Sequence, residues 1–233
     1  MINWVENFPQ IETFFISLFT YYFFYKIVNY FVKENKEYKE LSDDRKNYFL
    51  KNLVKAGVLM YISGIGSYVI YQGYILRIWK NKLIYMVGYQ YAALDVLGLI
   101  MVRKLPINSK IHHISSFLLA YLNTKVNYEQ STFWVGLPIY CLLSCYAFLV
   151  NLFLAMRLIK GLKELKILID ICYYSYGLLL LVNWSYQINV IYNFFELSIG
   201  LLFYVSLILF VANDDIKLMK FLKYHRIKAR KEN

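Results

Sequence analysis

The sequence has few residues that interrupt helices or cross-link chains. Proline occurs at only three positions, Pro9, Pro106 and Pro138, so long stretches of chain carry no helix breaker. Cysteine is equally sparse, and all three cysteines lie inside apolar runs with no C-x-x-C pair: Cys141, Cys145 and Cys172. This pattern predicts small core residues rather than disulfides or metal ligands.

Acidic residues are also scarce, with 15 Asp and Glu against 26 Lys and Arg, which gives a formal net charge of +11. A strongly basic chain suggests nucleic-acid binding, but here the cations lie in short segments between apolar runs and in the C-terminal tail. Membrane proteins keep cations in such places, so no nucleic-acid partner is predicted. No basic residue precedes the first apolar run, which is therefore predicted to be a retained span rather than a cleavable signal.

What the chain has in abundance is long apolar runs, with 59% hydrophobic residues. Seven runs approach the ~20 residues needed to cross the hydrocarbon of a bilayer. They cover about 10–32, 54–76, 83–102, 106–124, 131–156, 165–186 and 189–212. The sequence thus predicts an all-α, polytopic bundle of about seven transmembrane helices.

Lys and Arg are much denser on one set of the connecting segments than on the other, and positive segments stay cytoplasmic. This asymmetry predicts an outside or lumenal N-terminus and a cytoplasmic C-terminus. Residues 1–44 are expected to hold the first span and a linker, 45–225 the main membrane domain, and 226–233 a basic tail. The segment 33–55 is interpreted as a solvated linker, with an amphipathic surface helix in its second half as the alternative.

One stretch, residues 89–124, places an acid and two imidazoles inside apolar runs. Pro106 is a natural first residue for a helix that returns antiparallel to the preceding one. Counting about 1.5 Å per residue from the turn, Asp95 and His113 lie at the same depth, about 10 Å in. Because His112 and His113 point about 100° apart on a helix, only one of them is expected to share a face with Asp95. A buried carboxylate must be paired or protonated, so these three residues are the candidate catalytic group, with a purely structural pair as the alternative.

Other polar residues are weaker candidates. Glu196 has no cation near it in the sequence and is expected to face the bundle interior, and Asn151 could line it or link helices. Asp170 is expected to pair with Lys166 one turn away. Two histidines without an evident third ligand predict no metal site, and no other cofactor is indicated. Near the end of the chain, Arg230 and Lys231 are placed like a dilysine retrieval signal.

The order of an Asp in one span, a short basic turn with a proline, and a His-His pair opening the next span resembles the core of the TLC-domain family. The motif is LDVLGLIMVRKLPINSKIHHISSFLLAYL, and the resemblance would cover about 45–225. It implies an endoplasmic-reticulum or related membrane protein concerned with lipids. The helix after the His-His pair lacks the acidic and His-bearing stretch of ceramide synthases, so the likeness is closer to the TLCD branch. In that branch, the family's Asn and Arg near the end of this helix would correspond to Asn151 and Arg157.

Three functions are consistent with these features. In the first, His113 or His112 is a general base oriented by Asp95, in acyl or lipid-group transfer between an acyl-thioester, sphingolipid or phospholipid and a second substrate. In the second, the same residues form a buried structural link in a protein that binds membrane lipid or carries cargo without catalysis. A transporter or receptor fits the number of spans only in general terms, because no pair of interrupted helices marks a transport site.

Overall fold

The structure, a computed structural model, describes residues 10–130, 132–195 and 198–231, and within them all regular elements are helical. The long helices are α1 (Gln10–Val32), α3 (Asp43–Ile70), α4 (Asn81–Met101), α5 (Ile107–Asn123), α8 (Lys166–Asn193) and α9 (Ile199–Lys231). Shorter ones are α2 (Lys36–Lys39), α6 (Gly136–Ser144) and α7 (Phe148–Met156). A π-helical segment, Tyr71–Ile75, extends α3, and 3₁₀ turns at Phe133–Val135 and Cys145–Ala147 precede α6 and join it to α7.

Among the described residues, six helical stretches are long and apolar enough to cross a membrane. They are Ile11–Val32, Asp43–Ile75, Asn81–Met101, Phe133–Met156, Lys166–Asn193 and Ile199–Lys231. Helices satisfy their own backbone hydrogen bonds, which is why apolar runs of this length are helical in a bilayer. The apolar helical bundle is compatible with the predicted integral, multi-pass membrane protein. The predicted fourth span corresponds to α5, whose 17 residues fall short of the ~20 that span the hydrocarbon.

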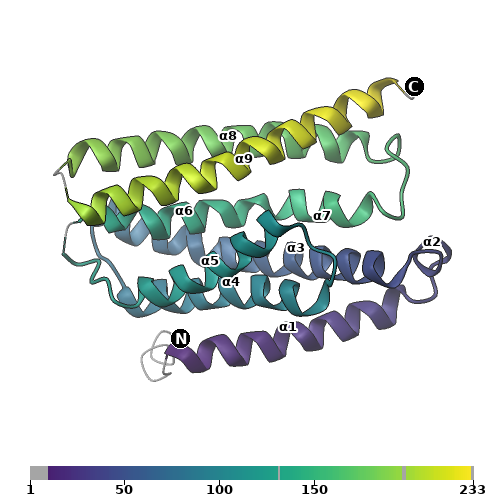
Figure 1. Ribbon diagram of the computed structural model, residues 1–233, viewed down its shortest axis with the longest axis horizontal. Coiled ribbons are helices and arrows are strands. Elements are labelled where there is room, and N and C mark those ends of the chain that lie inside the picture. Colours follow the sequence, from purple (N-terminus) through teal and green to yellow (C-terminus); the bar gives the residue numbers. More distant parts are fainter. Residues whose placement is uncertain (1–9, 131, 196–197, 232–233) are drawn as a thin grey trace.

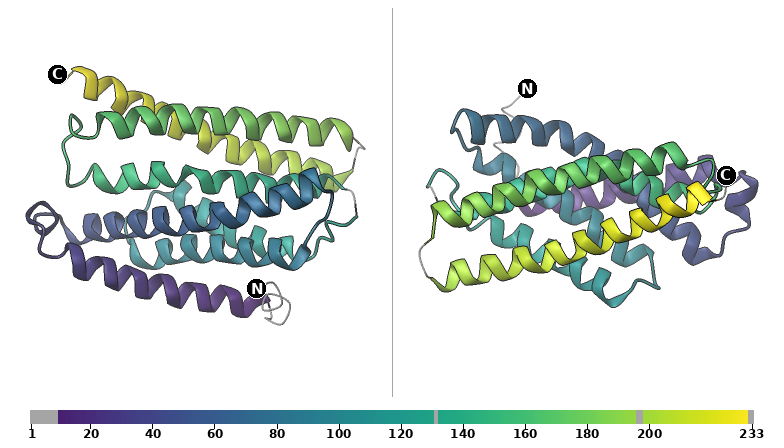
Figure 2. Two further views of the ribbon diagram at one scale, coloured as in Figure 1. Left: turned by 180° about the vertical axis from the view of Figure 1, so that it is seen from behind. Right: turned by 90° about the horizontal axis from the view of Figure 1, so that it is seen from above.

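The long helices run roughly along one axis, as Figures 1 and 2 show. In Figure 1, α1 lies at one side of the bundle next to α4, and the pair α8 and α9 lies at the other side. Between them, α3 packs against α4 and α7, and α5 packs against α4. This order leaves α3 and α4 as the central helices, so polar side chains on their facing surfaces are shielded from lipid.

Two groups of buried side chains hold the bundle together. The larger core joins α1, α3, α4 and the ends of the neighbouring helices, and includes Phe49, Leu59 and Tyr204. A smaller one joins α7, α8 and α9 around Phe153 and Cys172. Cys145 and Cys172 are buried and all three cysteines are free, as the sequence predicted.

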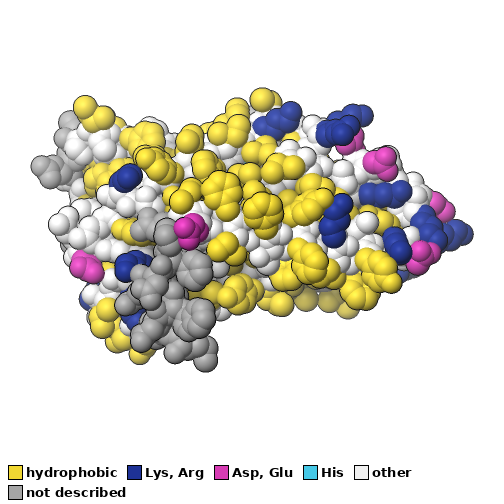
Figure 3. Space-filling model, turned by 90° about the horizontal axis from the view of Figure 1, so that it is seen from below, with side chains coloured by type: hydrophobic (Ala, Val, Ile, Leu, Met, Phe, Trp, Pro, Cys, Tyr) yellow, Lys and Arg dark blue, Asp and Glu magenta, His cyan; other side chains and the backbone are white. Residues whose placement is uncertain are grey.

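The outer surface is largely apolar along the middle of the bundle (Figure 3). On α1, for example, Phe19, Phe23 and Phe31 are all more than 60% exposed, as suits side chains that face lipid tails. Lys and Arg gather at the end where α2 and the C-terminal end of α9 lie (Figures 1 and 3). Exposed basic residues of this end are Lys33, Lys36, Lys39, Lys104, Lys160 and Arg230.

The predicted linker over 33–55 is wrong in its second half. Helix α3 begins at Asp43 and continues through the expected start of the second span without a break. Residues 43–53 are mostly charged and polar, so hydropathy alone places them outside the bilayer, yet Phe49 and Leu50 are buried in the core. The basic residues Lys51 and Lys55, counted from the sequence as loop cations, consequently lie inside the bundle.

Helices α5 and α9 flank a gap in the bundle wall. Helix α5 packs on α4 and helix α9 packs mainly along α8, and within the described ranges the two share no extended contact with one another. A cavity lined by residues of α3, α4, α5, α6, α7, α8 and α9 lies there, and the candidate site borders it.

Candidate functional site

The α4–α5 hairpin brings Asp95 and His113 together as the sequence predicted. The turn at residues 102–106 ends with Pro106 in an extended conformation (φ −54°, ψ 147°), and α5 begins at the next residue. The Nδ1 atom of His113 lies 2.9 Å from Oδ1 of Asp95, and both residues are buried. The N–H of the ring is not in line with that oxygen, so the contact is electrostatic rather than a well-formed hydrogen bond.

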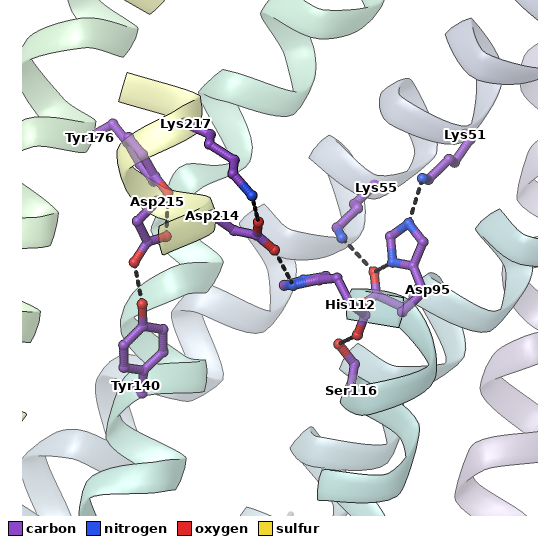
Figure 4. Close-up of polar contacts among 11 residues, drawn as sticks. Lys51, Lys55, Asp95, His112, Ser116, Tyr140, Tyr176, Asp214, Asp215 and Lys217 are labelled. Carbon is purple, nitrogen blue, oxygen red and sulfur yellow. Dashed lines mark hydrogen bonds and ion pairs between the residues drawn. The ribbon is translucent and has the colours of Figure 1, made fainter. Parts of the chain in front are cut away.

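Two lysines from α3 complete this cluster, and the sequence analysis missed both. The Nζ atom of Lys55 lies 2.6 Å from Oδ1 of Asp95, and the Nζ atom of Lys51 lies 3.0 Å from Nε2 of His113 (Figure 4). Being four residues apart, the two lysines share one face of α3. Their residues are only 7% and 8% exposed. We call Lys51, Lys55, Asp95 and His113 the lysine cluster.

The contacts of His113 define its tautomer. An ammonium group has hydrogens to donate and no lone pair, so Nε2 of His113 must accept from Lys51. In a neutral imidazole the hydrogen then resides on Nδ1, the atom that faces Asp95. With this assignment the lysine cluster contains two ammonium groups and one carboxylate.

The second histidine points elsewhere, as expected for neighbours on a helix. The Nδ1 atom of His112 lies 3.6 Å from Oδ2 of Asp214, on α9, and Asp214 also lies 3.4 Å from Nζ of Lys217 (Figure 4). This contact connects α5 to α9 across the gap between them. The side chain of His112 is 29% exposed, so it is the more accessible of the two imidazoles.

Next to Asp214, Asp215 forms a separate buried group with neutral donors. It accepts hydrogen bonds from the hydroxyls of Tyr140 and Tyr176, the latter at 2.7 Å (Figure 4). Nε1 of Trp184 donates a third, at 3.4 Å. Within the described ranges no Lys, Arg or His pairs with Asp215 at ion-pair distance. We call Asp215 with Tyr140, Tyr176 and Trp184 the tyrosine cluster.

A cavity of about 720 Å³ separates the two clusters. Its polar lining comes from both sides: Lys51, Lys55, His112, His113, Tyr140, Tyr176, Asp214 and Asp215. The rest of its wall is mostly apolar, with Leu59, Val87, Leu119, Leu137, Leu142 and Ile208 among the lining residues. A cavity of this volume is of the size that small-molecule and lipid-sized ligands occupy, with a few polar groups to orient them.

Asp95, His112 and His113 offer a possible set of metal ligands, which the sequence analysis did not predict. Their ligand atoms lie within 4.8 Å of one another. Lysine ammonium groups already contact two of these ligands, Lys55 at Oδ1 of Asp95 and Lys51 at Nε2 of His113. A divalent cation would therefore have to bind beside two ammonium groups, whose charge repels it, so the arrangement fits an ion-paired cluster better than a metal centre.

The weaker candidates from the sequence are distributed differently. Asn151 and Arg157 line the cavity. The amide of Asn151 donates a hydrogen bond to the carbonyl of Ala147, four residues earlier. The guanidinium of Arg157 lies 5.0 Å from the centre of the Phe221 ring. Glu196 lies outside the described residues. The expected pairing of Asp170 with Lys166 is wrong.

Asp170 instead pairs with two arginines of the next helix. Its Oδ1 atom lies 2.6 Å from Nε of Arg226 and 3.2 Å from Nη2 of Arg230, because α9 runs back along α8 and brings its basic end beside the start of α8. Helix α9 continues through Lys231. Arg230, a predicted part of a retrieval signal, is thus half exposed and already in contact with an acid.

Comparison with known proteins adds no relative. No protein-family model, curated protein or solved structure matches the chain. The resemblance to the TLC-domain family stays a prediction from the motif in residues 94–122.

Signals for the missed residues exist in the sequence but are weak. Lys51 and Lys55 stand four apart with Leu50, Val54 and Leu59 on neighbouring faces, as in a helix that continues into the apolar run. The Asp214-Asp215 pair follows directly on the last apolar run. Both features also fit the polar flank of a membrane helix. For this reason the sequence analysis placed the two lysines in a solvated linker.

Proposed function

We propose that this chain is an integral membrane protein of lipid metabolism or lipid homeostasis that binds a lipid or similar amphiphile in the cavity and acts on its polar end. The observation that supports this most is the composition of the cavity wall. Apolar side chains make up most of it, and His112, His113, Lys51 and Lys55 form a compact polar patch on one side. An acyl chain fits the first kind of surface and a head group the second.

The proposal includes a seven-span topology and an endomembrane location. In it, α5 is the fourth and shortest crossing, the N-terminus is lumenal and the basic end of the bundle is cytoplasmic, in keeping with the positive-inside rule. The likeness of residues 94–122 to the TLC-domain core supports an endoplasmic-reticulum or related membrane, with Arg230 and Lys231 as a candidate retrieval signal. The partners are membrane lipid and an acyl-thioester, sphingolipid or phospholipid substrate.

The proposed chemistry is acyl or lipid-group transfer, with the two histidines in different roles. His112 is the better placed general base, because its ring faces the cavity and Asp214 lies beside Nδ1, which leaves Nε2 to accept a proton from a lipid hydroxyl or amine. The deprotonated oxygen or nitrogen would attack the acyl carbonyl, and the leaving group would take the proton. His113 would act in this way only after Lys51 leaves Nε2, so we assign it, with Asp95, to holding the α4–α5 hairpin in position.

Replacement of each histidine tests the proposal. We expect His112→Ala to abolish the lipid difference between cells that express the protein and cells that do not, since a positioned base contributes about 10²–10⁴-fold to rate. His113→Ala is expected to reduce that difference in proportion to the folded protein that remains. Lipid extracts are compared by mass spectrometry, and the amount of folded protein in each culture is measured alongside them. His225→Ala is the control, because His225 lies on α9 against Phe221 and away from Asp95.

A second candidate, lipid binding without catalysis, is favoured by a specific feature of the lysine cluster. Contacts link Lys51 to His113, His113 to Asp95 and Asp95 to Lys55, so the burial of Asp95, His113 and Lys55 is accounted for without a reaction. The same experiment separates the two functions. Lipid that co-purifies with the protein while the lipid extracts of expressing and non-expressing cells are identical would contradict the enzymatic proposal and leave the binding one.

A further inference from the structure

The lysine cluster has more positive than negative charge. Its two ammonium groups share a single carboxylate, because Lys55 occupies Asp95 and Lys51 contacts only the neutral imidazole of His113 at hydrogen-bond distance. Lys51 is 7% exposed and lines the cavity. A buried ammonium group without its own counter-charge is costly, and a ligand that supplied the missing anion would relieve that cost.

The packing of Lys51 shows that its position is built into the fold. Its side chain crosses α4 directly over Gly98, where a Cβ atom would lie 2.6 Å from Cε and 3.0 Å from Nζ of Lys51. Any larger residue at position 98 would therefore push the lysine out of this groove. Glycine costs stability inside a helix, so its presence here is explained by the close approach of the lysine.

Arg157 is a further cation that lines the same cavity. It lies at the end of α7, and the central carbon of its guanidinium is 5.0 Å from the ring centre of Phe221 and 6.0 Å from that of Tyr48, one turn before Lys51 on α3. Within the described residues no carboxylate pairs with Arg157, and its buried Nε atom has no hydrogen-bond partner. The contacts with the two rings leave the N–H groups of the guanidinium for an acceptor in the cavity.

The α9 side of the cavity carries more negative than positive charge. Asp214, Asp215 and Lys217 line it, and Lys217 pairs with Asp214, whereas Asp215 has neutral donors only. An anionic group inside the cavity would be repelled by that side and attracted by Lys51 and Arg157. The charges of the two walls thus favour one orientation of a bound anion.

From these contacts we infer that Lys51 and Arg157 form a site for the anionic group of an amphiphile, a phosphate or carboxylate head group whose acyl chain occupies the apolar part of the cavity. The inference rests on the proposed function, since it assigns a charge class to the ligand of the same cavity. It requires no catalysis and no contact with His112.

The test compares a charged and a neutral ligand with the same chain. Protein in non-ionic detergent is titrated with radiolabelled 1-oleoyl lysophosphatidic acid and with 1-oleoylglycerol. We expect the phosphate-bearing lipid to bind about tenfold more tightly to the wild type, and Lys51→Gln or Arg157→Gln to remove that preference while binding of oleoylglycerol is unchanged. Lys104→Gln is the control, because Lys104 lies on the α4–α5 turn with its side chain 86% exposed.

Two further variants keep the test decisive. Gly98→Ala retains every charge but displaces Lys51, so it should lower the preference for the charged lipid as Lys51→Gln does. Arg157→Gln breaks no ion pair and serves if Lys51→Gln fails to fold. Equal binding of both lipids to the wild type, or a preference that survives both charge removals, would overturn the inference and leave the amphiphile cavity standing.

Binding of neither lipid would instead count against the proposed function itself. Inorganic phosphate is the last arm of the experiment. If phosphate at the concentration of the lipid displaces lysophosphatidic acid completely, the site takes a free anion, and the assignment to a head group is wrong.

Discussion

Two buried carboxylates, Asp95 and Asp215, lie on opposite sides of one cavity and are stabilised in different ways. Asp95 is fully buried and contacts an ammonium group and an imidazole. Asp215 is 9% exposed and accepts hydrogen bonds from two phenols and an indole. The first arrangement balances charge with charge, and the second disperses one negative charge over neutral donors.

The difference affects what each cluster contributes to the protein. Loss of one member of a buried ion pair leaves an uncompensated charge, whereas loss of one neutral donor leaves the remaining donors in place. The lysine cluster also joins three helices: the Lys55–Asp95 ion pair links α3 to α4, and the imidazole of His113 links α5 to both. We therefore expect the lysine cluster to carry more of the stability, and the tyrosine cluster to tolerate change.

The largest effect is expected for Asp95→Asn. This substitution leaves Lys55 buried without a counter-charge, which typically costs about 3–5 kcal/mol of unfolding free energy. Unfolding in detergent is followed with a thiol-reactive fluorophore in a Cys141→Ser background, because Cys141 is half-buried and lines the cavity, whereas Cys145 and Cys172 are 0% exposed and react only when the bundle opens. Combining Asp95→Asn with Lys55→Met removes the stranded charge and should recover part of the loss. A single-variant loss below about 1 kcal/mol would show that the pair is not the structural centre of the bundle.

The sequence contains enough to predict that Asp95 meets His113. Both lie the same distance from a turn marked by Pro106, and helix geometry converts that spacing into equal depth. The structure confirms the contact at 2.9 Å. It confirms as well that adjacent histidines diverge, since His112 reaches Asp214 on another helix.

Lys51 and Lys55 could not be predicted in the same way. Hydropathy treats a lysine before an apolar run as a loop residue on the membrane surface, and most lysines in such positions are. Here α3 begins at Asp43 and its polar first turns pack inside the bundle, because α4 and α5 supply Asp95, His113 and the open groove at Gly98. These are long-range partners, which local sequence does not show.

A smaller effect is expected for Asp215→Asn. The amide oxygen still accepts from the hydroxyl of Tyr176, but the new N–H₂ group replaces the acceptor that faces Tyr140 and Trp184. No charge is stranded by the change, so the expected loss is about 1–3 kcal/mol, measured with the same thiol-reactive assay. A loss as large as that of Asp95→Asn would contradict the comparison, because it would mean that a cation depends on Asp215 after all.

The smallest effect is expected for Tyr176→Phe. The phenol donates to Oδ1 of Asp215 at 2.7 Å, and its removal leaves the carboxylate with Tyr140 and Trp184 on the other oxygen. A single hydrogen bond to a charged group contributes about 1.5–3 kcal/mol. Water in the adjacent cavity offers Oδ1 a replacement donor, so we expect a smaller loss of unfolding free energy, about 1 kcal/mol. In the Asp215→Asn background, Tyr176→Phe should cost less than in the wild type, because the hydrogen bond that it removes then goes to a neutral amide oxygen rather than to a carboxylate. Full additivity in this double-mutant cycle would show that Tyr176 stabilises the α8–α9 pair by packing rather than through Asp215. The contrast between a carboxylate paired with charged groups and one bound by neutral donors would then rest on Tyr140 and Trp184 alone.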